Sequence, residues 1–307
     1  MKAPELSIVA TVYNDASIVP VLVNKIRQHV DTLGISYEII LVDDCSTDGS
    51  SEEIEKVCNI YENVKGLILS RNFGQQIAMS AGMKVSTGNF VIIMDGDLQN
   101  PTVAIPLLYH EILNGYDVVY TASKTRNNRF DTLTSVIFWY ILTKVFGIEI
   151  VKNQLMMKIM TRAFVEKFNC YKEIVRTVTG IVRDISSNYM VISVENSPRC
   201  IGKSHYNFLK RLNLSIDLII SLSRAPFNFV IYIGFLAFCA SVVLVMLQFF
   251  QTIQLFPDGF AFIGSFLFFF CSLIVLLLGV IGRYLACIYL EVRSRPLFQV
   301  KKYYNFR

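Results

Sequence analysis

The sequence contains few charged side chains, and it lacks the motifs of several common nucleotide- and metal-binding sites. Only 17% of its 307 residues are charged and 53% are hydrophobic, which is too apolar for an average soluble protein. The seven cysteines form no Cys-x-x-Cys pair and no Cys/His spacing of the kind that binds zinc, so we expect reduced, mostly buried thiols. The Gly-x-Gly-x-x-Gly fingerprint and the Gly-x-x-x-x-Gly-Lys-Ser/Thr loop are both absent, which disfavours a dehydrogenase and a P-loop enzyme.

Two long runs contain no charged side chain at all. Phe227 to Phe250 is 24 residues long, and Phe260 to Gly282 is 23 residues long. Each run exceeds the roughly 20 residues with which a helix crosses a bilayer. Buried core helices are the alternative, but two such runs only nine residues apart favour two transmembrane helices within residues 226–290.

Basic residues at the flanks of these runs predict their orientation. The connector 251–259 has no Lys or Arg, whereas both outer flanks are rich in them. The positive-inside rule then places both termini and the globular domain in the cytoplasm. We therefore expect a multi-pass protein of the inner (plasma) membrane, with a basic cytoplasmic tail at 291–307 and no secretory signal. The net charge of +5 owes much to these flanks and suggests anionic lipid headgroups, not nucleic acid, as partners.

Residues 1–203 are expected to form a globular α/β domain. Strand-like and helix-like segments alternate up to about residue 125, which predicts right-handed βαβ units and a mainly parallel sheet. Residues 126–200 look more helical and less regular, with one further strand. The expected strands are Leu6–Tyr13, Tyr37–Asp44, Val64–Ser70, Asn89–Asp95, Tyr116–Ala122 and Tyr189–Val194, and the expected helices lie near 17–31, 50–61, 74–86 and 102–114.

The segment 204–225 carries apolar side chains at helical spacing, interrupted by Lys210, Arg211 and Asp217. Such a pattern beside an apolar run predicts an amphipathic helix in the membrane interface. A helix packed on the globular domain is the alternative.

Acidic side chains stand at the carboxyl ends of three expected strands. Asp95 and Asp97 follow one strand, Asp44 ends another, and Thr11 to Asp15 close the first. These ends share one edge of a parallel sheet, where open α/β sheets bind ligands. Two carboxylates one residue apart are hard oxygen ligands for a divalent cation that also holds substrate phosphates. Each segment alone could be a simple turn, but together they predict a metal–diphosphate site, beside which a nucleoside could stack on Tyr13.

In their order, these motifs resemble the family 2 glycosyltransferases of the GT-A fold. The similarity is greatest to the polyprenyl-phosphate branch, the dolichol-phosphate mannose synthases and bactoprenol-phosphate glucosyltransferases. It covers essentially the whole chain and implies a GT-A domain with a mainly parallel sheet, an interface helix and two transmembrane helices. The matching motifs are Val12-Tyr13-Asn14-Asp15, Val42-Asp43-Asp44-x-Ser46-Thr47-Asp48-Gly49, Ser70–Gly74 with Ala81-Gly82, Asp95-x-Asp97-Leu98-Gln99-x-Pro101, and Arg199-x-x-Gly202-x-Ser204-x-Tyr206.

The resemblance implies a role for each motif. A metal, Mg²⁺ or Mn²⁺, would be bound by Asp95, Asp97 and Gln99, and the catalytic residues would be Asp97, Asp95 and Arg199. For Arg199 and Lys203, snorkelling at the membrane surface is the alternative. The residues expected to bind the nucleotide are Thr11, Tyr13, Asp15, Asp44 and Met94, and those expected to bind phosphate oxygens are Arg199, Lys203, Ser204 and Arg126.

Several positions depart from the family pattern. Asp15 stands for the usual Glu, Cys45 for a Gly, and His205 for a frequent Lys. Many relatives place an acid before an Arg-Leu-Met-x-Arg run, where this chain has Met156, so no catalytic acid is available there. Near Ser123, where the branch has an Arg, the nearest basic residues include Arg126. These changes affect the prediction of which sugar is transferred more than the prediction of the reaction class.

The expected reaction is inverting transfer of a sugar from a nucleotide-diphosphate sugar, expected to be a UDP-sugar, to undecaprenyl phosphate. The lipid-linked product would serve cell-envelope glycans such as O-antigen, and a homotetramer is expected only because some relatives form one. A phosphate acceptor is already largely ionised at pH 7, so it needs no general base. The alternatives are transfer to a lipid or glycan hydroxyl and a non-catalytic membrane scaffold. A processive polysaccharide synthase is disfavoured because its Gln-x-x-Arg-Trp element is missing around Trp139, the only Trp.

Overall fold

The computed structural model describes residues 3–97, 101–123, 154–171, 178–195 and 295–306, with scattered helical residues between 267 and 293. By its internal contacts the chain divides into two compact units. The first contains Met1–Ser135, Ile150–Arg211 and Pro296–Arg307, and the second contains Val136–Glu149 and Leu212–Arg295. All of the strands below belong to the first unit.

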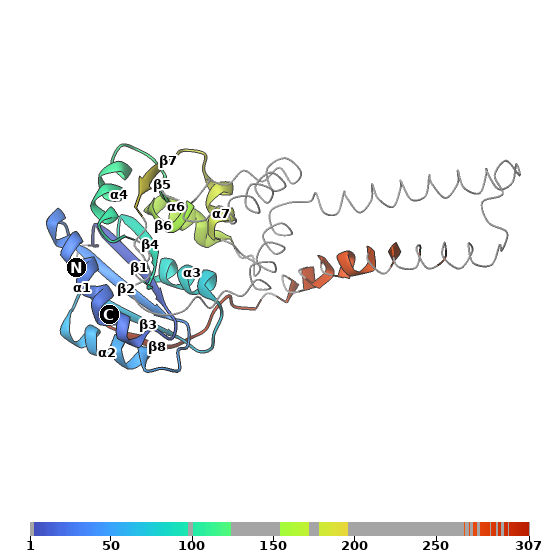
Figure 1. Ribbon diagram of the computed structural model, residues 1–307, viewed down its shortest axis with the longest axis horizontal. Coiled ribbons are helices and arrows are strands. Elements are labelled where there is room, and N and C mark those ends of the chain that lie inside the picture. Colours follow the sequence, from blue (N-terminus) through green and yellow to red (C-terminus); the bar gives the residue numbers. More distant parts are fainter. Residues whose placement is uncertain are drawn as a thin grey trace, which may run out of the picture. The chain divides into compact units, whose positions relative to one another are not determined.

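Among the described residues, eight strands form one sheet in the order β7-β5-β6-β4-β1-β2-β3-β8 (Figure 1). Strands β1 to β4 are mutually parallel, β7 is parallel to β5, and β6 runs antiparallel between β4 and β5. The expected mainly parallel α/β sheet is thus confirmed. The strands are β1 (Leu6–Val12), β2 (Tyr37–Asp43), β3 (Val64–Leu69), β4 (Phe90–Asp95), β5 (Val118–Ser123), β6 (Gln154–Thr161), β7 (Tyr189–Val194) and β8 (Val300–Tyr304).

Helices cover both faces of the sheet, as the connections between parallel strands require. One apolar cluster joins α1, α2 and α4 to one face, and a second joins α3, α6 and α7 to the other. The short helices η1 (Ala16–Ile18) and η2 (Asp31–Leu33) flank α1. The longer helices are α1 (Val19–Val30), α2 (Ser50–Ile60), α3 (Gln75–Val85), α4 (Ala104–Ile112), α6 (Arg162–Cys170) and α7 (Val178–Ile185).

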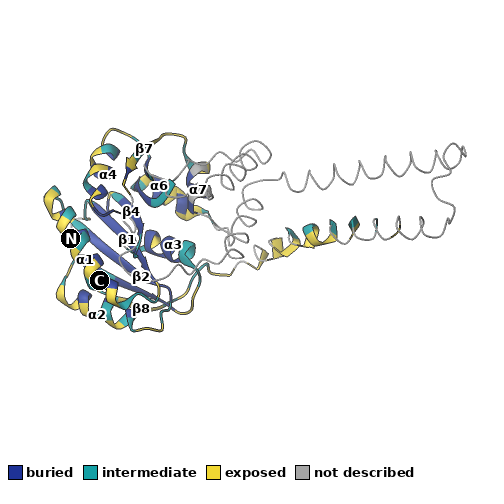
Figure 2. Cartoon of the chain, viewed as in Figure 1, coloured by how far each residue is buried: buried dark blue, intermediate teal, exposed yellow. Residues whose placement is uncertain are grey.

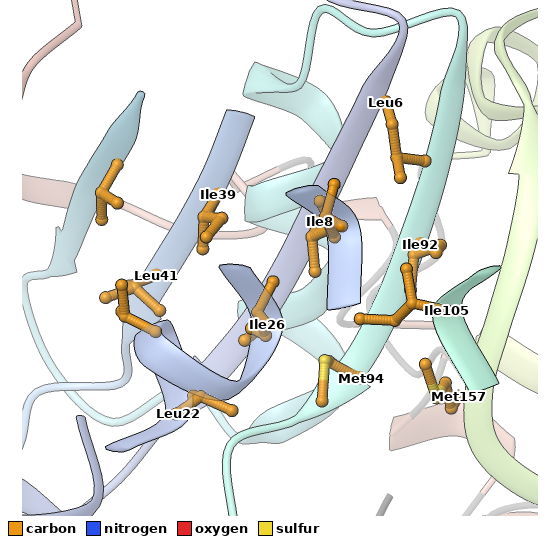
Figure 3. Packing of buried hydrophobic residues seen from close by; sticks show 14 of the residues in the cluster. Leu6, Ile8, Leu22, Ile26, Ile39, Leu41, Ile92, Met94, Ile105 and Met157 are labelled. Atoms are coloured by element: carbon orange, nitrogen blue, oxygen red, sulfur yellow. The ribbon is translucent and has the colours of Figure 1, made fainter. Parts of the chain in front are cut away.

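The buried position of the central strand β1 explains why its sequence is almost wholly apolar. All seven of its residues are buried, because successive side chains point to opposite faces and each face carries a helical layer. Leu6 and Ile8 belong to the first cluster together with Leu22 and Ile26 of α1 (Figure 3), whereas Val9 belongs to the second. Figure 2 shows the central strands β1, β2 and β4 as mostly buried.

Strand β6 is absent from the strands predicted from the sequence. The segment 126–200 is expected to be more helical and less regular, with Tyr189–Val194 as its one strand, yet Gln154–Thr161 pairs with both β4 and β5. Its run of methionines has weak strand propensity, and Lys158 in its middle argues against a strand buried on both faces. Pairing with two distant strands outweighs these local preferences.

Strand β8 is a second correction, because part of the expected basic tail 291–307 belongs to the sheet. Val300–Tyr304 pairs antiparallel with β3 and closes that side of the sheet. Its Lys301 and Lys302 are exposed, as is common on edge strands, where charge discourages pairing with other chains. Beyond it, the Asn305 side chain donates hydrogen bonds to the carbonyl oxygens of Cys58 (2.6 Å) and Val64 (2.8 Å).

The expected interface helix 204–225 and the apolar run 227–250 lie outside the described residues, and the run 260–282 is described only in part. Within the described part of the chain, no helix has both the length and the hydropathy of a membrane span. The described residues of the second unit between 267 and 293 are mostly helical, and several are exposed and apolar, including Leu278, Leu285 and Val292.

Candidate active site

The carboxyl ends of β1, β2 and β4 bring acidic residues to one edge of the sheet, as expected. Thr11 of β1 pairs in register with Asp95 of β4, and Val12 pairs with Asp43 of β2. Beyond these pairs, the N–H of Asp44 donates to the carbonyl oxygen of Val12 at 3.1 Å. The first aspartate of the Asp-Gly-Asp motif and the Asp43-Asp44 pair therefore flank the same strand end.

Gly96 determines how closely the Asp-Gly-Asp turn approaches β1. Its N–H donates to the carbonyl oxygen of Thr11 at 3.0 Å, and a Cβ at this position would lie only 2.4 Å from that oxygen. Only glycine fits such an approach without moving the strands apart. Asp95 and Asp97, on either side of it, are both partly exposed and so accessible to a ligand.

Asp95 is oriented by a residue that the sequence analysis did not identify. The side-chain amide of Gln75, the first residue of α3, donates a hydrogen bond to one carboxylate oxygen of Asp95. The sequence gives no signal for this contact, since Gln75 and Asp95 come from separate segments.

Asp44 is held by the loop that contains the Ser70–Gly74 motif. Its two carboxylate oxygens accept the backbone N–H groups of Phe73 (2.7 Å) and Gly74 (2.8 Å). Burial raises the pKa of Asp44 above its usual value; the two N–H groups and Arg71 oppose this rise, and neighbouring Asp43 adds to it. The carboxylate is therefore fixed in direction, and each oxygen retains a lone pair for a base or ribose donor.

Asp43 has a structural role. It is fully buried, and it accepts hydrogen bonds from the N–H and hydroxyl of Ser46 (3.0 and 2.5 Å) and from the hydroxyl of Ser51. Cys45 between these residues has a positive φ of 62°, where the family usually has glycine. The thiol of Cys45 is free and partly exposed.

The loops after β1 and β2 are tied to each other. Asn14 accepts the N–H of Thr47 at 2.9 Å, and Asp48 accepts the N–H groups of Ala16 (2.9 Å) and Ser50 (3.1 Å). Asp48 thus satisfies a free N–H at the start of α2. These bonds hold the expected nucleotide-binding loops in one arrangement.

The expected nucleotide-binding residues differ in how accessible they are. Tyr13 is 45% exposed directly after β1, so its ring is free to stack, and Asp15 is partly exposed. Thr11 is 8% exposed and faces the α3 side of the sheet. The side chain of Met94 is fully buried in the first apolar cluster (Figure 3), so the prediction that Met94 binds the nucleotide stays a prediction for its backbone groups.

Of the three expected metal ligands, Asp95 and Asp97 belong to the described residues, and Gln99 lies outside them. In the described ranges, no three or more His, Cys, Asp or Glu side chains form a metal-binding group. A pair of carboxylates fits Mg²⁺ or Mn²⁺ where substrate phosphates supply further oxygen ligands. The expected phosphate-binding residues Arg126, Arg199, Lys203 and Ser204 also lie outside the described residues.

Solved structures with low sequence identity share this fold. The glucosyl-3-phosphoglycerate synthase of Mycobacterium tuberculosis, crystallised with Mn²⁺, UDP-glucose and phosphoglyceric acid, matches with a TM-score of 0.50 and 15% identity, over 71% of this chain and 78% of that chain. The mannosyl-3-phosphoglycerate synthase of Rubrobacter xylanophilus also has a TM-score of 0.50, at 14% identity, over 72% of this chain and 73% of that chain. The sheet order and these likenesses identify the expected GT-A fold.

Relatives of higher identity match along nearly the whole chain. An undecaprenyl-phosphate 4-deoxy-4-formamido-L-arabinose transferase of Proteus mirabilis is 31% identical over 98% of this chain and 94% of its own length. An uncharacterized glycosyltransferase of Bacillus subtilis is 30% identical over the same shares of both chains. The model of the family described as glycosyl transferase family 2 matches residues 7–172, which include Asp44, Asp95 and Asp97. The chain therefore belongs to glycosyl transferase family 2.

Proposed function

We propose that the chain is an inverting, metal-dependent transferase that moves a sugar from a nucleotide-diphosphate sugar to a polyprenyl phosphate at a membrane surface. The observation that supports this most directly is the contact of Gly96 with Thr11. It fixes Asp95 and Asp97 at the edge of the sheet where a sugar nucleotide is expected to bind.

The donor nucleoside is proposed to lie between the loops after β1 and β2. Exposed Tyr13 offers a ring for stacking on the base, and Asp44 offers carboxylate oxygens whose direction is set by Phe73 and Gly74. Because the two loops are already ordered by their mutual hydrogen bonds, little ordering is left to occur on binding. A UDP-sugar is the proposed donor.

The donor diphosphate is proposed to bind beside the Asp-Gly-Asp turn. Asp95 and Asp97, together with Gln99, would hold Mg²⁺ or Mn²⁺, which when bound supplies positive charge to the departing nucleoside diphosphate. Gln75 orients one oxygen of Asp95. Arg126 and Arg199 would add planar donors for phosphate oxygens.

The acceptor is proposed to be a phosphate and not an alcohol. Strand β6 runs antiparallel to β4, so its first residues, including Met156, lie toward the edge that carries Asp95. Thioether sulfur cannot remove a proton from an alcohol, whereas a phosphate monoester is already ionised. The undecaprenyl-phosphate transferases that match almost the full chain support the same acceptor.

The apolar segments would hold the lipid. Leu278, Leu285 and Val292 are exposed side chains on the described helical residues of the second unit, and apolar surface of this kind suits contact with lipid. We propose that the runs 227–250 and 260–282 anchor the protein in the plasma membrane, with the catalytic domain on the cytoplasmic side. The phosphate would meet Arg199, Lys203 and Ser204, and the product would serve a cell-envelope glycan.

A comparison of two acceptors tests this function. Purified full chain in detergent receives a panel of nucleotide sugars, Mg²⁺ or Mn²⁺, and either undecaprenyl phosphate or undecaprenol. We expect one donor to give a lipid-linked sugar with the phosphate alone, detected by mass spectrometry and cleaved by mild acid. Equal transfer to undecaprenol, or no transfer from any donor, would refute the proposed acceptor.

A further inference from the structure

Lys158 on β6 is a buried cation beside the candidate site. Its side chain is fully buried, and its ammonium nitrogen has no hydrogen-bond partner among the residues that the structure describes, although its three N–H groups each need an acceptor. Burying an ammonium without a hydrogen-bonded partner destabilises a fold, so apolar residues usually fill such positions. The cost indicates that this charge serves something other than packing.

The pairing of strands shows what the ammonium lies near. Lys158 is opposite Ile93 of β4 on one side and opposite Tyr120 of β5 on the other. Side chains two residues apart on a strand share a face, so Asp95 is the diagonal neighbour of Lys158, within reach of a long side chain. The ammonium lies 5.5 Å from the centre of the Tyr120 ring.

The electrostatics agree with this arrangement. Burial lowers the pKa of Lys158 to about 8, and the carboxylate of Asp95 opposes that decrease. The carboxylate of Asp95 accepts a hydrogen bond from Gln75 of α3. It also interacts electrostatically with the ammonium of Lys158 on β6.

We propose, resting on the function proposed above, that Lys158 is a positioning residue whose ammonium offsets part of the negative charge of the Asp95–Asp97 pair. With two carboxylates and one ammonium, these three groups carry a single net negative charge. A divalent cation then binds weakly by itself and tightly only together with the negatively charged donor diphosphate. Metal and nucleotide would accordingly bind and dissociate together, so that a site without nucleotide does not retain the metal.

A purely structural role for Lys158 predicts different behaviour. If the side chain only supported the fold, its replacement by an apolar residue of similar length would lower the melting temperature and leave metal affinity unchanged. On the proposed role, Lys158→Met removes a buried ammonium that lacks a hydrogen-bond acceptor among the described residues, so the melting temperature is kept or raised. The affinity for the metal alone rises.

The test measures binding of Mn²⁺ alone to the full chain in detergent at pH 7, by calorimetry or by the electron paramagnetic resonance of free Mn²⁺. Lys158→Met is expected to lower the dissociation constant about tenfold, because a cation close to the site is removed. Lys158→Arg keeps the charge and is expected to match the wild type. The control Lys65→Met removes a cation that pairs with Glu38 at 2.6 Å near the amino ends of β3 and β2, at the other end of the strands from the site, and it is expected to leave Mn²⁺ affinity unchanged.

An unchanged or weaker Mn²⁺ affinity in folded Lys158→Met would overturn the inference. If that variant does not fold, Lys158→Gln, which is also uncharged, takes its place with the same expected outcome. Asp97→Asn separates the two proposals. If the wild type binds Mn²⁺ no better than Asp97→Asn, the metal site itself is wrong and the inference fails with it. If Asp97→Asn weakens binding and Lys158→Met changes nothing, only the role of Lys158 is wrong.

Discussion

Gly96 contributes to the site as much as the carboxylates on either side of it. Its missing Cβ lets the turn lie against the carbonyl oxygen of Thr11, and this contact sets where Asp95 and Asp97 stand relative to β1. Displacement of catalytic groups by about 1 Å can cost about a hundredfold in rate. At the scale of single residues, positioning should therefore be as sensitive to substitution as the charges themselves.

Gly96→Ala is expected to lower sugar transfer about a hundredfold while the chain still folds. The new Cβ would lie 2.4 Å from the Thr11 oxygen, so the turn must move outward. The measurement is the turnover number together with the melting temperature. Gly34→Ala is the control: it strains a left-handed position with φ of 63° and open space around it, just before the amino end of β2, whereas the site lies at the carboxyl ends of the strands. Wild-type turnover in Gly96→Ala would show that the turn tolerates displacement.

Glu38 gives a prediction that concerns the fold alone. It accepts hydrogen bonds from Ser7 (2.6 Å) and Thr87 (2.7 Å) and pairs with Lys65. Burial acts to raise the pKa of Glu38, but Lys65, Ser7 and Thr87 outweigh it, so the pKa is lowered from 4.5. Its stabilisation is thus complete above the unfolded pKa and is lost as pH falls through the folded pKa.

Glu38→Gln should therefore lower the free energy of unfolding by about 2 kcal/mol at pH 7. The difference from the wild type should shrink as the pH falls below 4.5, since the wild-type carboxyl then becomes neutral as well. Urea unfolding across this pH range measures it, and sugar transfer at pH 7 by the folded variant should be unaffected. A difference that stays constant with pH would show that the charge of Glu38 contributes nothing.

At the scale of secondary structure, the last strand ties the end of the chain to the sheet. The Asn305 side chain donates to carbonyl oxygens of Cys58, Tyr61 (3.3 Å) and Val64, at the point where α2 ends and β3 begins. The hydroxyl of Tyr304 donates to Glu55 of α2 at 2.9 Å. These bonds join β8 to a segment more than 240 residues earlier.

Asn305→Ala is expected to destabilise the domain by about 1–2 kcal/mol, because three carbonyl oxygens lose a donor. Thermal unfolding measures this. Lys301→Ala, an exposed position on the same strand, is the matched control and should stay within about 0.5 kcal/mol of the wild type. Equal effects of the two substitutions would mean that Asn305 does not anchor the strand.

The elements show where local sequence is informative. Strands β1 to β5 and their helices follow the prediction to within a few residues, because apolar runs there are bounded by Gly, Pro and Asp. Strands β6 and β8 depend on partners far along the chain, and their own residues give weak signals. The same division holds in the site. Asp44, Asp95 and Asp97 stand in recognisable motifs, whereas Gln75 and Lys158 matter only through contacts made by folding.

At the scale of the whole molecule, the proposed function combines two anionic reactants that repel each other in water. The nucleotide sugar would be held at the edge formed by β1, β2 and β4. The lipid phosphate would come from the membrane, where the apolar segments would hold its lipid chain. Preorganised positive charge makes their approach favourable and stabilises the departing diphosphate. Loss of the metal should therefore abolish transfer while the fold, which depends on the two apolar clusters, persists.

The most direct measurement is the rate of lipid-linked sugar formation from undecaprenyl phosphate by the wild type and by Asp97→Asn, with Mn²⁺ and with EDTA. We predict that EDTA abolishes the product, that added Mn²⁺ restores it, and that Asp97→Asn reduces it at least a hundredfold at an unchanged melting temperature. Asp31→Asn, in η2 before β2, should behave as the wild type. Undiminished product in EDTA, or from Asp97→Asn, would contradict a paired-aspartate metal site as the centre of this enzyme.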